Sequence, residues 1–454
     1  MITNKITNSI YDVGIFGAGV SGVAAAYNHA RFSNIRKVLM LEKSPAIATI
    51  NSHPLNNAQT SHDGSTETNY NLAHALKVQK AARYLRNYLK SKGCDPTLYR
   101  KALRMVLGVG SEEVAQLTER FDEFSPHYPD IFEAGKKWLE DHEPMIMEGR
   151  DPKESVSAIV STEGYIVNYQ RYAEELFKDT IRLNPDFDYA FNAPVQSIEF
   201  KDDHYEVKTP TNTFYCKVVL FEAGPYSLFF ARELGYGLDY AILPVAGSFY
   251  SAGHLLKNKV YRVQIEGMPF AAIHGDPDIL DMTDTRFGPT TKPLPLMERH
   301  HYRTFKDFMK LPLLSSMQGI SALLKVVNEN NLWRYAAKNF IFDMPIMGPA
   351  VFLKEVRPII PTIKYSDLKL RRGAGGIRPQ IVNLKTKKLE MGDSSIVGKN
   401  SIFNTTPSPG ASVSMANGRR DAKKTVEFLG PGYYFDEEKF QKELGEIGQV
   451  PATP

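Results

Sequence analysis

The stretch YDVGIFGAGVSGVAAAYNHA, residues 11–30, indicates the fold class of this chain. Its apolar start, which ends at Phe16, is typical of a buried parallel strand, and the Ala-rich segment 20–30 has the composition of a helix. The turn between them contains the GxGxxG glycines Gly17, Gly19 and Gly22. The first permits the tight turn, the second lets the backbone approach a pyrophosphate, and the third lets the helix pack close to the strand. The stretch therefore predicts a dinucleotide-binding unit.

The segments around these glycines fit a dinucleotide as well. With Val20 and Ser21 at its start, the helix directs free N–H groups and the positive end of its dipole toward the phosphates. A second apolar run, KVLML at 37–41, ends at Glu42, whose carboxylate can accept hydrogen bonds from the adenosine ribose hydroxyls and disfavours a 2′-phosphate. We expect Glu42 and the adjacent Lys43 to contact the cofactor.

NAD and FAD share this unit, and two later segments favour the flavin. CKVVLFEAG, residues 216–224, is typical of a buried strand ending in Ala223 and Gly224, far along the chain from the first unit. SIFNTTPSPGASVSMANG, residues 401–418, predicts a strand, a turn and a helix that starts with small residues. Such a helix can stabilise the negative charge that reduction places on the pyrimidine end of an isoalloxazine, although a plain strand-to-helix turn is the alternative. The further cofactor contacts we expect are Val195, Pro409, Gly410 and Ala411.

The order of these segments predicts an α/β chain, α+β overall, with a discontinuous Rossmann-like domain. We expect the FAD-binding domain to comprise residues 1–90, 155–235 and 370–430, and an inserted, mainly antiparallel-sheet substrate domain to comprise 91–154 and 236–369. Within the insertion, 111–145 is expected to be largely helical and 240–290 to form antiparallel strands. Residues 431–454 are expected to be a tail with a short helix near 437–444.

Composition excludes several classes of protein. The 454 residues are 43% hydrophobic and 23% charged, which is ordinary globular usage, and no stretch has the roughly 18 uncharged apolar residues of a membrane span. The first ten residues lack an apolar signal core, so we expect a protein that stays inside the cell. Cys94 and Cys216 make neither a metal pair nor a disulfide framework, the His300–His301 pair has no further ligand pattern, and the net charge of +4 is too small for nucleic-acid binding. We expect no metal and no nucleic-acid partner.

Six motifs together resemble the malate:quinone oxidoreductase family, part of the D-amino-acid-oxidase-like superfamily. They are NNAQTSHDGSTETNY (56–70), LPVAGSFY (243–250), FAAIHGDPD (270–278), TRFGPT (285–290), GGIRPQ (375–380) and NTTPSPGAS (404–412). The resemblance implies an enzyme with noncovalent FAD that oxidises (S)-malate to oxaloacetate and passes the electrons to membrane quinone without NAD. It also implies a peripheral position on the inner face of the cytoplasmic membrane. The alternatives are an FAD enzyme like L-2-hydroxyglutarate dehydrogenase and a flavin-binding subunit without chemistry of its own.

Malate chemistry needs cationic anchors for two carboxylates and an acceptor for the hydroxyl proton. The resemblance places Arg378, in GGIRPQ, over the flavin as the first anchor. Arg286 in TRFGPT is the second, although it can equally pair with an aspartate such as Asp278 or Asp284. Tyr250 is expected to hydrogen-bond a carboxylate.

Two histidines are candidates for the base. His274 comes first because the resemblance places its strand in the sheet that covers the flavin, and His62 follows because it comes soon after the first flavin unit. Gln59 and Thr60 are expected to donate to flavin or substrate.

The positive charge gathers in residues 299–338. Seven basic and two acidic residues give this stretch +5, and the rest of the chain sums to −1. Its apolar residues Leu313, Met317, Ile320, Leu324 and Val327 recur at helical spacing. Basic flanks around an apolar stripe are typical of an interfacial membrane helix, whereas a helix packed on its own domain is the alternative.

Overall fold

Parallel strands form the centre of the first sheet, which carries the glycine turn. The computed structural model describes residues 10–264, 272–329, 332–390, 395–405 and 409–445. The sheet has the order β21-β22-β11-β1-β2-β8, with β22, β11, β1, β2 and β8 parallel. Its strands are β1 (Tyr11–Phe16), β2 (Val38–Leu41), β8 (Phe187–Ala190), β11 (Thr213–Phe221), β21 (Ser395–Gly398) and β22 (Ser401–Asn404), and the hairpin β9 (Ser197–Lys201) and β10 (His204–Lys208) extends β11. In register, Phe16 lies beside Leu41 and Phe221, so these strands end at one edge.

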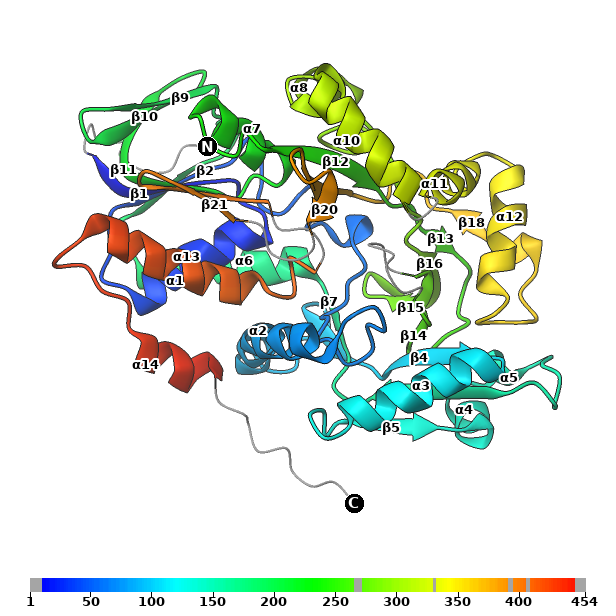
Figure 1. The fold of residues 1–454 in the computed structure, drawn as a ribbon. Coiled ribbons are helices and arrows are strands. Elements are labelled where there is room, and N and C mark those ends of the chain that lie inside the picture. Colours follow the sequence, from blue (N-terminus) through cyan, green and yellow to red (C-terminus); the bar gives the residue numbers. More distant parts are fainter. Residues whose placement is uncertain (1–9, 265–271, 330–331, 391–394, 406–408, 446–454) are drawn as a thin grey trace.

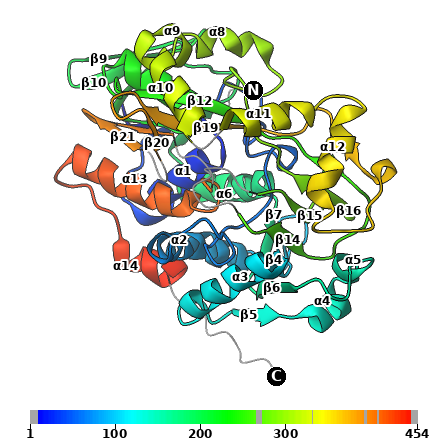
Figure 2. The same cartoon turned by 45° about the vertical axis from the view of Figure 1, so that its right-hand side comes forward.

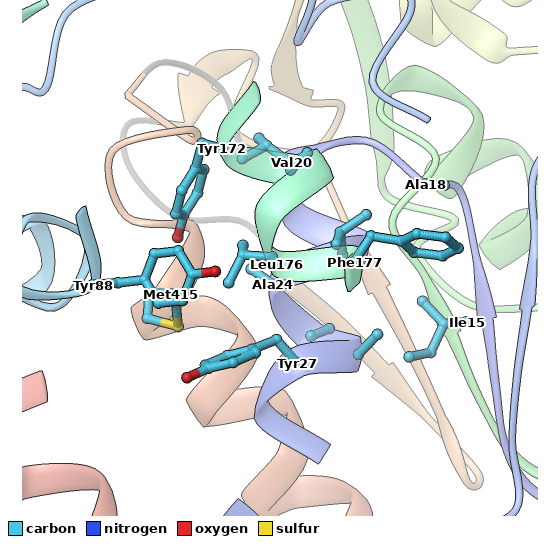
Figure 3. Close-up of a cluster of buried hydrophobic side chains, with 14 of the residues drawn as sticks. Ile15, Ala18, Val20, Ala24, Tyr27, Tyr88, Tyr172, Leu176, Phe177 and Met415 are labelled. Carbon is cyan, nitrogen blue, oxygen red and sulfur yellow. The ribbon is translucent and has the colours of Figure 1, made fainter. Parts of the chain in front are cut away.

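Helices α1 (Val20–Phe32), α6 (Tyr169–Leu183) and α13 (Ser414–Leu429) lie side by side against this sheet (Figure 1). The α1 alanines are fully buried, and their small side chains let α13 approach closely. Larger side chains fill the remaining space, as the cluster of Tyr27, Tyr172, Leu176 and Met415 illustrates (Figure 3). Helix α2 (Leu72–Ser91) adds Tyr88 to the same core, and α7 (Pro225–Glu233) follows β11.

Two further sheets make up the other half of the molecule. A four-stranded antiparallel sheet has the order β17 (Lys292–Pro293), β12 (Tyr240–Ala246), β19 (Ile377–Asn383), β20 (Lys388–Glu390). An eight-stranded sheet has the order β18 (Lys369–Leu370), β13 (Tyr250–Ser251), β16 (Asp281–Gly288), β15 (His274–Asp278), β14 (Lys259–Arg262), β4 (Arg104–Val109), β6 (Val156–Ser161), β5 (Ile131–Ala134). A two-stranded ribbon joins β3 (Tyr99–Lys101) to β7 (Tyr165–Val167).

The remaining helices cover these sheets. Near β4 and β6 they are α3 (Ser111–Phe124), α4 (Lys136–His142) and α5 (Pro144–Met147). The helices α8 (Phe305–Phe308), α10 (Met317–Asn328), α11 (Leu332–Ile341) and α12 (Met347–Val356) lie along one outer side of the molecule in both views (Figures 1 and 2). Between α8 and α10 comes α9 (Pro312–Ser315), and α14 (Glu437–Phe440) continues into the π-helical turn Gln441–Gly445.

The mixed α/β architecture confirms the predicted fold class, but several elements differ from expectation. The stretch 111–145 is largely helical, as expected, but it also contains β5, which pairs with β6. The segment 240–290 is divided between two sheets, since β12 pairs with β19 instead of its neighbours in sequence. Strand β6 belongs to the eight-stranded sheet although residue 155 was the expected start of a cofactor-domain segment. None of the described helices combines the length and apolar character required to cross a bilayer.

The expected apolar stripe does not form one helix face. Leu313 lies on α9 and is only 1% exposed within a core cluster, whereas Met317 and Leu324 on α10 are 83% and 59% exposed. Most of the large hydrophobic side chains that the structure leaves exposed lie between residues 302 and 347. They are Tyr302, Phe305, Leu314, Met317, Ile320, Leu324, Trp333, Phe340, Met344, Ile346 and Met347.

Candidate active site

A cavity of about 770 Å³ lies where the parallel strands of the first sheet end. This is the edge at which α/β sheets bind their ligands. The predicted cofactor contacts on its lining are Gly17, Gly19, Val20, Ser21, Glu42, Lys43, Gln59, Thr60, Val195, Ala223, Gly224, Pro409, Gly410 and Ala411. Gly22 is not on the lining. Residues 406–408, in the middle of the predicted turn, lie outside the described residues.

The three glycines of the turn occupy different environments. Gly17 has φ +105°, a conformation that favours glycine, and it packs against the Glu222 carbonyl. A Cβ on Gly22 would lie 1.9 Å from the Gly17 carbonyl oxygen, so Gly22 permits close packing of helix and strand. A Cβ on Gly19 would meet only the Ser52 hydroxyl at 3.5 Å and would otherwise project into open space. The backbone at Gly19 is therefore bare where it faces the cavity.

Glu42 is held at the end of β2 by two main-chain donors. The Ala18 N–H donates to Oε2 at 2.7 Å, and the Ser44 N–H donates to Oε1 at 2.8 Å. The carboxylate is buried but lines the cavity. Its remaining lone pairs can accept hydrogen bonds from hydroxyl groups of a ligand. Next to it, the Lys43 ammonium forms an ion pair with Glu298 and lies 4.1 Å from the centre of the Tyr226 ring.

Arg378 lines the same cavity from strand β19. Among the described residues, no carboxylate forms an ion pair with its guanidinium, and burial lowers the pKa of this group. The tyrosines Tyr335 and Tyr261 are the titratable groups that act on it. A largely buried guanidinium without an anionic partner is a strong binding group for a carboxylate ligand.

His62 lines the cavity and is oriented by a carboxylate. Its Nδ1 lies 2.6 Å from Glu67 Oε1, and its main-chain N–H donates to Ser412 Oγ at 2.9 Å. Burial alone would raise the pKa of Glu67, but Arg104 and the His62 hydrogen bond outweigh burial and hold the pKa below its ordinary value. The ionised Glu67 favours the tautomer with the proton on Nδ1, which leaves Nε2 as the proton acceptor.

His274 is not on the cavity lining. Its ring stacks on Tyr261, with the ring centroids 4.3 Å apart, and its side chain is 1% exposed. Burial lowers the pKa of His274 to about 3, which makes it a weak base. The Tyr261 hydroxyl lies 2.9 Å from Thr60 Oγ1, and Thr60 does line the cavity. Tyr261 therefore lies beside the cavity lining, and His274 is stacked on its ring.

Arg286 and Tyr250 are committed to other partners. Arg286 donates to Asp276 at 2.9 Å and to the Pro54 and Asn57 carbonyls, so it pairs with a different aspartate from those we expected. The Tyr250 hydroxyl donates to a main-chain carbonyl, and neither residue lines the cavity. The expected second cationic anchor and the expected tyrosine contact are thus not brought to the site.

Gln59 lines the cavity but its amide is bound within the protein. Its Nε2 donates to Asp278 at 2.8 Å, and its Oε1 accepts from the Ile279 N–H at 2.9 Å. The residues that sequence reasoning missed include Glu67, which orients His62, and Tyr261, which interacts with Arg378. Glu67 lies in the same motif as His62, so the five-residue separation was a usable signal. Tyr261 had none, because only the sheet pairing brings it near the site.

Comparisons with known proteins agree on one family. A model of the malate:quinone oxidoreductase family matches residues 9–418. The malate:quinone oxidoreductase of Helicobacter pylori is 35% identical over 444 residues, covering 96% of this chain and 98% of that protein. A probable malate:quinone oxidoreductase of Campylobacter jejuni is 35% identical over 445 residues, covering 96% and 99%.

Two solved oxidases, one of them with FAD bound, have the same fold. The L-α-glycerophosphate oxidase of Mycoplasma pneumoniae with FAD bound has a TM-score of 0.63 at 16% identity, covering 92% of this chain and 95% of that chain. The glycine oxidase of Geobacillus kaustophilus has a TM-score of 0.62 at 17% identity, covering 95% and 97%. At this identity the likeness concerns the fold.

Proposed function

The chain belongs to the malate:quinone oxidoreductase family, and on this premise we propose which of its residues bind and oxidise malate. The enzyme uses FAD, oxidises malate to oxaloacetate and passes the electrons to a quinone. The family match does not favour an L-2-hydroxyglutarate enzyme or a flavin-binding subunit without chemistry.

The large cavity fits FAD at three points. The bare backbone at Gly19 leaves room for a pyrophosphate, and the N-terminus of α1 directs its free N–H groups there. Glu42 offers carboxylate oxygens to ribose hydroxyls. When bound, FAD supplies the hydride acceptor; the protein residues hold the cofactor and the substrate.

Arg378 binds a malate carboxylate in this proposal, and the observation that carries it is that no carboxylate of the described residues pairs with its guanidinium. The guanidinium can donate two parallel hydrogen bonds to one carboxylate, which fixes both the position and the orientation of the substrate. Tyr261, just behind the lining, acts electrostatically on the Arg378 guanidinium and hydrogen-bonds to Thr60, which does line the cavity.

His62 takes the proton from the malate hydroxyl. Its Nδ1 is occupied by Glu67, so Nε2 is the acceptor, and the ionised Glu67 stabilises the imidazolium that forms. His274, the first choice from the sequence, is a weaker candidate because it is stacked behind Tyr261 and is not on the lining. The removal of this proton allows the C2 hydrogen to leave as hydride.

The outer helices α8 to α12 are proposed to rest on an anionic membrane surface, where the quinone is. Their exposed side chains, such as Met317, Leu324 and Trp333, would enter the interfacial region. Several basic residues of this stretch pair with acids in the structure: Lys310 with Asp307, Lys325 with Glu329, and Lys338 with Glu355. The exposed Arg303, Lys306 and Arg334 have no carboxylate within 4.0 Å among the described residues and would each contribute roughly 1 kcal/mol of attraction.

Anaerobic stopped-flow measurement of flavin bleaching tests the assignment of the base. His62→Gln is expected to slow bleaching by malate about 100- to 10,000-fold while the protein keeps its flavin, because a glutamine cannot accept the proton. His274→Gln is the matched variant and should bleach at a rate close to that of the parent enzyme. If His274→Gln bleached slowly and His62→Gln bleached at the parent rate, the base would be His274 and not His62. Faster bleaching of the parent enzyme by L-2-hydroxyglutarate than by malate would contradict the choice of substrate.

A further inference from the structure

A second cavity, of about 300 Å³, lies between strand β12 and helices α9, α10 and α11. Its wall is formed by apolar side chains such as Leu243, Val245, Leu313, Val326 and Leu332. Among the described lining residues, only Thr291 and Tyr335 have polar side chains, and their hydroxyl groups lie next to each other. This lining fits a flat apolar ring that carries a few hydrogen-bond acceptors.

This cavity and the large one share the strand pair β12–β19 in their walls. Val245 and Pro244 on β12 line the small cavity, and their partners across the ladder are Arg378 and Pro379 on β19, which line the large cavity. Tyr335, on the wall of the small cavity, is close enough to Arg378 for the two to interact electrostatically. The proposed malate site and the apolar cavity are therefore neighbours at the β12–β19 pair.

Part of the small cavity's lining belongs to the outer face of the molecule that carries the exposed hydrophobic residues. Leu314 is part of the lining and is also 37% exposed. Helix α10 contributes Val326 to the lining and presents Met317 and Leu324 outward. An apolar molecule entering from a bilayer beneath these helices would meet Leu314, which belongs both to the exposed face and to the cavity lining.

We propose that this cavity binds the ring of the quinone acceptor, with the prenyl tail leaving past Leu314 toward the membrane. Tyr335 and Thr291 are the hydrogen-bond partners of a quinone carbonyl. Malate oxidation releases two electrons and two protons; the quinone takes up two electrons from the reduced flavin in the neighbouring large cavity and two protons from solvent. The products are oxaloacetate and the hydroquinone, so no further reactant is needed. The inference rests on the proposed function, because it needs flavin reduction by malate in the large cavity.

The proposal is tested by placing a large side chain in the cavity and measuring the KM for decylubiquinone, a soluble quinone. Val326→Trp would occupy the space of the ring, and Tyr335→Phe would remove a hydrogen bond while keeping the volume. We expect Val326→Trp to raise the KM for decylubiquinone at least about tenfold, and Tyr335→Phe to raise it by a smaller factor. Leu238→Trp is the matched control, since Leu238 is 54% exposed and lies on neither cavity.

Two further measurements distinguish a failure of the proposed quinone site from a failure of the proposed malate oxidation. Bleaching by malate and reoxidation by ferricyanide should be unchanged in Val326→Trp. A photoreactive quinone, added without malate, should label peptides of β12 or α10 in the parent protein and lose this labelling in Val326→Trp. Unchanged quinone KM in both variants, or malate displacing the photoreactive quinone from the oxidised enzyme, would overturn the proposal. A parent enzyme that malate does not bleach would instead refute the proposed function.

Discussion

Replacing Arg378 by lysine tests how the enzyme binds its substrate. The guanidinium is largely buried and has no carboxylate partner among the described residues, so a malate carboxylate would be its anionic partner. Lysine keeps the charge but offers a single point of donation in place of the two parallel hydrogen bonds. With about 1.5–3 kcal/mol for a hydrogen bond to a charged group, plus the lost orientation, we expect a loss of about 2–4 kcal/mol. Malate affinity should fall about 30- to 900-fold.

The assay is an anaerobic titration of the flavin spectrum with malate, and with succinate as a dicarboxylate that carries no hydroxyl group. Arg378→Lys should bind both malate and succinate more weakly. The two parallel hydrogen bonds that it lacks are made to a carboxylate and not to the hydroxyl group. An affinity for both within about threefold of the parent value would refute the reasoning.

The unfolding free energies of two methionine variants show whether Arg378 serves binding or the stability of the fold. Arg378→Met removes a buried charge that no carboxylate neutralises, so the free energy of unfolding should change little or rise. Arg286→Met should lower it by about 2–4 kcal/mol, because the Pro54 and Asn57 carbonyls each lose one donor and Asp276 loses a cation. Equal destabilisation by the two variants in urea titrations would mean that Arg378 is structural.

Three other predictions follow from the same structure. Gly19→Val should fold but lose its FAD, since its side chain would occupy the open space above the turn, whereas Gly22→Ala should lose stability by collision with a carbonyl; full flavin content in Gly19→Val would contradict this. The double variant Met317→Glu, Leu324→Glu should bind anionic vesicles at least about 100-fold more weakly in a sedimentation assay, while malate still bleaches its flavin. Unchanged sedimentation would exclude this face as the membrane contact. Burial lowers the pKa of His274 to about 3, so the unfolded chain binds a proton below about pH 6.5 that the folded protein does not. The free energy of unfolding should then fall by about 1.4 kcal/mol per pH unit from pH 6.5 toward 3, and an equally steep fall in His274→Gln would show that another group is responsible.

The local chemistry of the cofactor end was readable from the sequence. Gly17, Gly19 and Gly22 are required by steric constraints within a short segment of the chain. Glu42 is recognised by its position at the end of the second strand. The fold class followed from these patterns, because alternation of strand, turn and helix is a property of consecutive residues. The family resemblance added the substrate and the acceptor, which no periodicity contains.

The assignment of roles within the site depended on contacts between distant segments. Arg378 and Arg286 look alike in sequence, but β15 and β16 place Asp276 against Arg286, while β19 leaves Arg378 without an acid. The sequence ranked His274 above His62, whereas the structure stacks His274 on Tyr261 off the cavity lining and brings Glu67 to His62. Ion pairing and burial are set by which strands become neighbours, and strand pairing over hundreds of residues leaves no local pattern in the chain.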